Sequence, residues 1–133
     1  MSNLENTQAQ MRRGVLEFCV LSILSHAEVY PSDIIEKLKE AKLIVVEGTL
    51  YPLLTRLKNA GLVSYKWVES KSGPPRKYFS LTPLGEKFLE ELHGTWDELV
   101  EAVNNTTKKS GVGSRSTTAD SSFGRESGEI PQS

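Results

Sequence analysis

The fold of this chain is decided by residues 49–60, TLYPLLTRLKNA. Four leucines in this stretch recur at intervals of three and four residues, which is the spacing of one buried helix face; they are Leu50, Leu53, Leu54 and Leu57. Thr49 is a suitable N-cap, and Pro52 would then occupy the third helical position, where its missing N–H has no intrahelical partner. Gly61 is suited to ending the helix. The stretch therefore predicts a helix over residues 49–60 with one face against a core.

The opposite face of this predicted helix carries groups that can contact a nucleic-acid duplex, and no acidic residue lies among them. Arg56 can bind guanine edges or phosphates, Asn59 can donate and accept hydrogen bonds, and Tyr51 and Thr55 can bond to phosphates. The alternative interpretation is a solvated helix face with a chance arginine. The candidate nucleic-acid contacts in and beside this helix are Gly48, Thr49, Tyr51, Pro52, Thr55, Arg56, Lys58 and Asn59.

Two further helices are predicted upstream. Residues 11–25 are apolar around nearly the whole circumference of a helix, which indicates burial on several sides. In a domain of this size we expect a second chain to cover one of them. Residues 31–41 predict the other helix, with Pro31 in its first turn. Residues 43–46, LIVV, form a short β-prone run.

A β-hairpin is predicted downstream. Residues 62–69 and 76–81 are rich in β-branched and aromatic residues, and residues 70–75, SKSGPP, form a Gly/Pro loop between them. The loop and its border carry Lys71, Arg76 and Lys77, which are candidate contacts to phosphate or the minor groove. The alternative is an ordinary loop with solvated cations. Three helices followed by a hairpin with basic residues is the order of a winged helix-turn-helix.

The last predicted helix is longer than a three-helix core needs. Thr82 is its predicted N-cap, and Pro83 is its first helical residue. Its apolar residues recur every three or four positions to about Asn104. A partner subunit is the simplest cover for the excess apolar stripe. The residues that we expect at a dimer interface are Val15, Phe18, Cys19, Leu92, Trp96, Leu99, Val100 and Val103.

Charge is distributed unevenly along the 133 residues, although the net charge is only −1. Residues 1–81 carry 11 Lys and Arg against 8 Asp and Glu, whereas residues 82–107 carry one Lys against 6 acids. A DNA footprint needs local positive charge rather than a positive total. The basic and acidic parts therefore suggest two faces with different partners.

Several classes of protein are disfavoured. There is no apolar run of about 18 residues for a membrane span, and the polar start of the chain does not look like a secretory signal. The single cysteine, Cys19, cannot form an internal disulfide and is expected to be an inert core thiol. We find no metal-ligand spacing, phosphate loop or nucleophile with a base. The sequence thus predicts a cytoplasmic protein without metal, cofactor or enzymatic activity.

Residues 11–103 resemble the PadR-like transcriptional regulators. The resemblance rests on residues 48–54, GTLYPLL, on the pairs at 56–57 and 61–62, on residues 76–82, RKYFSLT, and on Gly85; residues 13–16 and 33–35 also look like family positions. It implies a winged-helix dimer that binds operator DNA, usually as a repressor, with the first and last helices forming the dimer. The single C-terminal helix is similar to the compact members. Many relatives have a Gly-Tyr pair before the second helix, where this chain has Tyr30 and Pro31.

The resemblance also implies control by a small molecule, because some members accept flat aromatic compounds near the dimer axis. Trp96 could supply a stacking surface for such an effector; the alternative is that it only packs in the dimer interface. We therefore expect a mainly α-helical fold with a small β-hairpin. Residues 1–81 would form the winged-helix DNA-binding domain, with an N-terminal arm at 1–10. Residues 82–107 would form the dimerisation helix, and residues 108–133 a disordered tail.

Sequence reasoning thus predicts a ligand-responsive, homodimeric repressor that binds specific sites on double-stranded DNA. The alternative function is a winged helix that contacts other proteins without binding DNA. Such modules usually lack a basic hairpin (the wing) beside a helix face without acidic residues. This chain is expected to have both.

Overall fold

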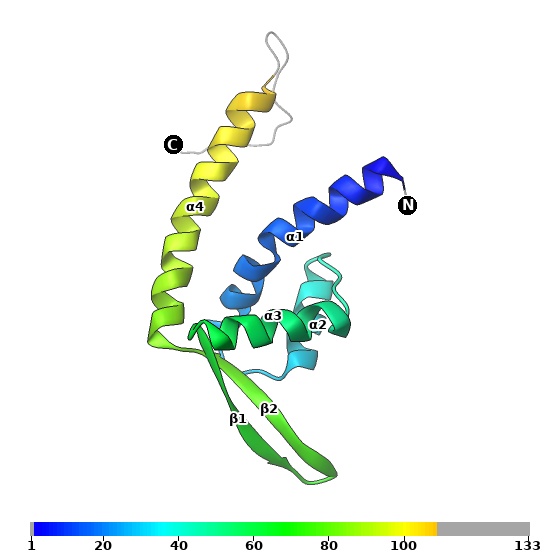
Figure 1. The fold of residues 1–133 in the computed structure, drawn as a ribbon, viewed down its shortest axis with the longest axis vertical. Coiled ribbons are helices and arrows are strands. Elements are labelled where there is room, and N and C mark those ends of the chain that lie inside the picture. The colour runs from blue at the N-terminus through cyan, green and yellow to red at the C-terminus, as the bar shows by residue number, and fades with distance from the viewer. Residues whose placement is uncertain (1, 109–133) are drawn as a thin grey trace. The chain divides into compact units, whose positions relative to one another are not determined.

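The computed structural model describes residues 2–108 and contains, in chain order, three helices, a hairpin and a long helix (Figure 1). Most of the tail predicted over residues 108–133 therefore lies outside the described residues. The chain divides into two units, Met1–Gly94 and Thr95–Ser133. The boundary between them falls within the last helix, α4 (Pro83–Thr107). The first unit holds the core and the hairpin.

Helix α1 spans Asn3–Leu24 and begins well before the predicted start at residue 11. Ser2 explains the early start, because its Oγ accepts a hydrogen bond from Glu5 N at 3.0 Å while Glu5 Oε1 accepts one from Ser2 N at 3.1 Å. This reciprocal pair satisfies two backbone donors at the helix start. The segment expected to be an N-terminal arm is therefore helical from Asn3 onward.

Helix α2 spans Pro31–Glu40, close to the prediction. It has Pro31 in its first turn, and the Asp33 carboxylate accepts a hydrogen bond from Tyr30 N at 3.0 Å. The helix is followed by Lys42 with a φ of 67°, a left-handed conformation that turns the chain away. The β-prone run at residues 43–46 is coil. Among the described residues no strand pairs with it, and an unpaired strand has no ladder to stabilise it.

Helix α3 spans Glu47–Asn59 with Val46 at the N-cap, so it starts two residues before the predicted cap. Thr49 lies inside the first turn, and Pro52 is the sixth helical residue rather than the third. A proline there removes the hydrogen bond to the Gly48 carbonyl, yet the helix continues through it. The predicted leucine face is confirmed, because Leu50, Leu53, Leu54 and Leu57 are all buried. Gly61, with a φ of 81°, follows the helix in the left-handed conformation.

The hairpin consists of β1 (Val63–Ser70) and β2 (Gly73–Leu81), which pair antiparallel from Val63↔Leu81 to Ser70↔Gly73. The expected six-residue loop is wrong, because only Lys71 and Ser72 lie between the strands. Residues 74–75, two prolines, belong to β2 at the point where the register shifts between Val68 and Ser70. Prolines lack the N–H that a regular ladder uses, and a bulge accommodates them.

The core of the first unit joins all its elements. Val29 adds a one-residue bridge to β2, donating to Phe79 O at 3.0 Å and accepting from Phe79 N at 2.8 Å. The hydroxyl of Thr82 donates to Gly61 O at 2.7 Å and accepts from Gly85 N at 3.0 Å, so it caps α4 and ties it to the end of α3. The buried apolar residues are Val20, Leu21, Leu24, Val29, Ile34, Leu38, Leu50, Leu53, Leu54, Leu57, Leu62, Val63, Phe79 and Leu89.

The residues through which α4 contacts this core only partly match the predicted apolar stripe. Leu89 is buried, while Leu84, which the sequence pattern placed in the stripe, is 55% exposed. Gly85 is also buried, and a Cβ there would overlap with the carbonyl oxygen of Leu62. A glycine is needed at this position because the backbones of α4 and residue 62 are in contact. Within residues 2–108, none of the helices has the length and apolar character that crossing a lipid bilayer requires.

Candidate nucleic-acid interface

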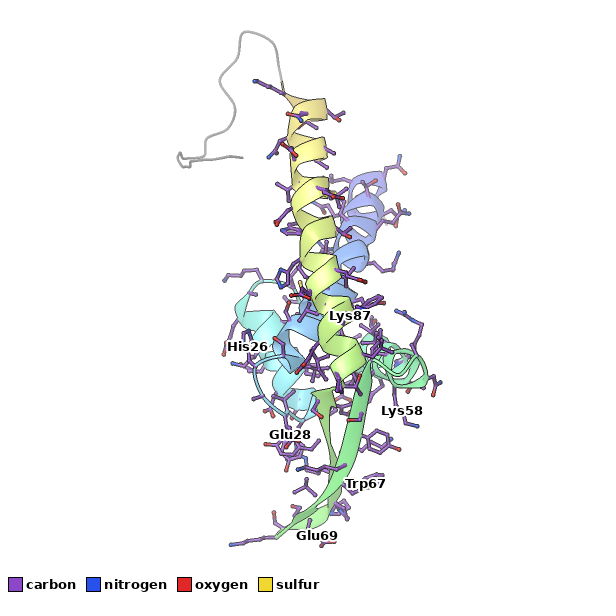
Figure 2. The ribbon with its side chains drawn as sticks, turned by 90° about the vertical axis from the view of Figure 1, so that its left-hand side faces the viewer. His26, Glu28, Lys58, Trp67, Glu69 and Lys87 are labelled. Atoms are coloured by element: carbon purple, nitrogen blue, oxygen red, sulfur yellow. The ribbon has the colours of Figure 1, made fainter. Side chains whose placement is uncertain are left out.

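A groove of about 570 Å³ lies between the exposed face of α3 and the hairpin. It brings together six of the residues predicted to contact nucleic acid, four from α3 and two from β2. Figure 2 shows Lys58 of α3 and Trp67 of the hairpin on the same side of the hairpin, with Glu28 on the other side. The predicted residues that line the groove are Tyr51, Thr55, Lys58, Asn59, Arg76 and Lys77.

The floor of the groove is aromatic, which the sequence reasoning missed. Lys77 pairs with Trp67 across the hairpin, and its ammonium lies 4.3 Å from the centre of the Tyr65 ring and 5.4 Å from that of Trp67. Lys58 approaches the same Tyr65 ring to 5.5 Å. Cations at these distances are attracted to the ring face. The two rings therefore hold two lysines, one from α3 and one from β2, over a common surface.

Strand alternation was the signal that could have revealed these aromatics. Successive residues of a strand point to opposite faces, so Tyr65 and Trp67 share one face of β1 while Lys66 lies on the other. Lys66 indeed forms an ion pair with Glu28 at 3.2 Å, away from the groove. Trp67 is 61% exposed and lines the groove, so its ring is a candidate contact surface.

Arg76 leaves β2 on the face opposite to Lys77, since the two are neighbours on one strand. Its guanidinium lies 3.8 Å from the centre of the Tyr30 ring, and its Nη2 donates to the hydroxyl of Ser32 at 3.1 Å. Arg76 therefore reaches the groove from the rim beside the start of α2. The two adjacent cations of the wing have different partners and different surroundings.

Arg56 does not line this groove. Its Nη1 donates to Glu17 Oε1 of α1 at 2.8 Å, and its side chain is 63% exposed. It borders a second hollow of about 590 Å³ together with two further predicted residues, Thr49 and Pro52, and with Arg13 of α1. The exposed face of α3 is thus divided into one side toward the hairpin and one side toward α1.

Three other positions belong to the candidate interface or border it. Gly48 has no atom within 4 Å of where a Cβ would lie, so the backbone of the first turn of α3 is open to approach. Lys71 lies exposed in the turn of the hairpin. Glu47 lines the groove at the start of α3, so the expectation of an acid-free face holds only from Gly48 onward. Three cations and one carboxylate leave the groove positive.

Comparison with known proteins decides the family. The family model described as the transcriptional regulator PadR-like family matches residues 20–91, which contain most of the core, α3 and the whole hairpin. The chain belongs to the PadR-like family of transcriptional regulators. A PadR-like transcription factor from Bacteroides fragilis is 62% identical to it, with a TM-score of 0.66 over 77% of this chain and 99% of that one.

Other solved structures of PadR-like regulators share this fold. A PadR family regulator from Eggerthella lenta is 30% identical, with a TM-score of 0.74 over 80% of this chain and 93% of that one. Bacillus subtilis PadR, solved in complex with operator DNA, is 23% identical, with a TM-score of 0.55 over 59% of this chain and 46% of that one. That likeness shows the fold, which is the winged helix-turn-helix expected from the sequence.

The residues expected at a PadR-like dimer interface fall into both units. In the first, Val15, Phe18, Cys19 and Leu92 are half-buried, and the Phe18 ring meets that of His93 edge-on at 5.0 Å. Burial raises the pKa of the Cys19 thiol, which lowers its thiolate fraction at neutral pH. In the second, Trp96, Leu99 and Val103 are 40%, 50% and 49% exposed, while Val100 is half-buried. Within residues 2–108, no cluster of His, Cys, Asp or Glu could hold a metal ion.

Proposed function

We propose that this PadR-like chain is a homodimeric repressor that binds specific operator sites on double-stranded DNA in the cytoplasm. The observation that carries the proposal is the groove between α3 and the hairpin, where Lys58 and Lys77 lie over one aromatic surface beside the polar side chains of α3. Cations supply the salt-dependent affinity for phosphates, and the neighbouring amide and hydroxyl groups supply base contacts. Bacillus subtilis PadR, which has this fold, binds operator DNA and so supports the proposal.

In this arrangement α3 enters the major groove. The buried leucines orient its outer side chains toward the duplex, and Asn59 and Arg56 are the candidates for base contacts, to adenine and guanine respectively. Lys77 and Arg76 of the hairpin would bind phosphates on either side of the wing, and Lys71 at the turn would reach the adjacent minor groove. Phosphate contacts would then fix the register in which α3 reads bases.

The proposed dimer rests on the apolar side chains of α4. Trp96, Leu99 and Val103 lie three and four residues apart on one helix face and are about half exposed. Such a stripe on a helix surface indicates an interface, and a two-fold axis would present two reading helices to successive major grooves. The exposed Trp96 ring also supports the proposed response to a flat aromatic effector, because rings of this kind stack on indole.

Selection of genomic fragments tests the proposal. The purified chain is incubated with sheared DNA from its host, bound fragments are sequenced, and the enriched site is measured by fluorescence anisotropy at several salt concentrations. We expect a two-fold symmetric site bound at least about a thousandfold more tightly than random DNA. A reporter gene behind that site tests repression. Equal binding to all fragments, or none, would contradict the proposal and favour a module for protein contacts.

A further inference from the structure

Tyr30 directly precedes α2 and lies beside the hairpin. It is placed there by a one-residue backbone bridge between its neighbour Val29 and β2. Val29 and Phe79 exchange two hydrogen bonds, of 3.0 and 2.8 Å, as an antiparallel pair. When that register is continued by one residue, Tyr30 falls opposite Tyr78, and the two rings stack with centres 4.5 Å apart and planes 15° from parallel. The bridge therefore fixes where the Tyr30 ring lies.

The same register brings Ser32 level with Arg76. The Arg76 guanidinium lies 3.8 Å from the centre of the Tyr30 ring, and its Nη2 donates to Ser32 Oγ at 3.1 Å. Two side chains from the start of α2 thus hold one side chain of the wing. An arginine held over an aromatic ring retains its other in-plane N–H donors, which suit a phosphate.

This contact also lowers the conformational entropy that the Arg76 side chain loses when it binds a ligand. A free arginine side chain loses several rotatable bonds when it is fixed on a ligand. Here the ring and the hydroxyl fix it before a ligand arrives, while the side chain stays on the surface of the wing. Tyr30 itself is half-buried, and its ring stacks on that of Tyr78 in β2.

We propose that Tyr30 is a positioning residue that, together with Ser32, holds Arg76 in the orientation in which it binds a backbone phosphate of DNA. The proposal rests on the proposed DNA-binding function and adds to it a role for the start of α2, a position outside the α3 and wing residues that the sequence singled out. Tyr30 acts through Arg76 and makes no base contact, so its effect on affinity is the same for every sequence.

A double-mutant cycle on the enriched operator tests this role. Tyr30→Leu keeps an apolar side chain beside the strand but removes the ring, and we expect it to weaken binding about three- to fivefold. Arg76→Ala should weaken binding further and reduce the salt slope by about 0.9, the value of one phosphate contact. In the Arg76→Ala background, Tyr30→Leu should have no further effect. Tyr30→Phe, which retains the ring, should bind as the original chain does.

Other results would overturn the proposal in distinguishable ways. If Tyr30→Leu weakens binding equally with and without Arg76, the ring has only a structural role. If Tyr30→Leu does not fold, Arg76→Lys provides the test, because a lysine keeps the charge but cannot lie over the ring as a planar fork. Binding by Arg76→Lys that matches the original chain would refute the positioning role. A failure of the original chain to bind any specific site would instead refute the proposed function.

Discussion

The guanidinium of Arg56 on α3 lies 2.8 Å from the carboxylate of Glu17 on α1. The two residues are far apart in the sequence, and the contact connects the helix proposed to read DNA to the helix expected to join the dimer. Both side chains are partly exposed, so the ion pair adds little stability. Its consequence is for binding, because Glu17 and a DNA phosphate or guanine would compete for one arginine.

Glu17→Gln should therefore tighten binding to the operator. The substitution removes the competing carboxylate and one negative charge beside the duplex, and we expect an increase of about two- to fivefold in affinity with little change in stability. Fluorescence anisotropy at low salt measures it. Glu90→Gln, an exposed carboxylate on α4, is the control and should change nothing. Weaker binding by Glu17→Gln would mean that the ion pair holds Arg56 in its reading orientation.

Arg56→Ala should reduce the preference for the operator over random DNA. If Arg56 binds a guanine, the loss is about 1–3 kcal/mol in specific binding and the preference at one base position is relaxed. Competition assays with single-base variants of the operator measure it. In the Arg56→Ala background, Glu17→Gln should have no effect. An equal loss on operator and random DNA would show instead that Arg56 contacts a phosphate.

Lys77→Ala should weaken binding to all sequences alike and lower the salt slope by about 0.9. The reason is that Lys77 lies in the groove over Tyr65 and Trp67, where it can neutralise one phosphate but reads no base. Lys66→Ala is the matched control, since Lys66 does not line the groove and is paired with Glu28. Equal slopes for the two variants would contradict the assignment of the groove as the DNA side of the wing.

Gly85→Ala should destabilise the fold, because its Cβ would overlap with the Leu62 carbonyl where α4 crosses the end of α3. Overpacking of this kind costs about 1–3 kcal/mol. Gly48→Ala, where the added Cβ meets no atom within 4 Å, should instead stabilise α3 by up to about 1 kcal/mol. Thermal unfolding at one protein concentration compares the two. A Gly85→Ala variant as stable as the original chain would show that α4 can shift away from residue 62.

The parts of the fold that the sequence predicted are those set by local spacing. The leucines of α3 repeat at helical intervals, so their burial follows from periodicity alone. The early start of α1 was missed, although Ser2 and Glu5 have the spacing of a reciprocal cap. The N-cap of α3 was predicted at Thr49 because threonine is a preferred N-cap residue. In the structure the residue with the extended N-cap backbone is Val46.

The candidate site was only partly readable because its geometry depends on contacts between distant residues. The sequence identified Arg56, Arg76 and Lys77 as candidate cations. It did not show that each of them contacts a different partner. The ion pair with Glu17 and the stacking of Tyr30 on Tyr78 follow from tertiary packing and from one backbone bridge. Such long-range pairings leave no periodic signal in the chain.

Leu99→Glu should convert the proposed homodimer into monomers. Leu99 is 50% exposed on α4 between Trp96 and Val103, and in a two-fold interface each carboxylate would be buried against apolar side chains without a partner. Sedimentation velocity measures the mass in solution, and Glu98→Gln, the neighbouring exposed position, is the control. Because one reading helix reaches only one half-site, the monomer should lose most of its preference for the operator over random DNA. A Leu99→Glu variant that sediments as the original chain does would remove this helix face from the interface.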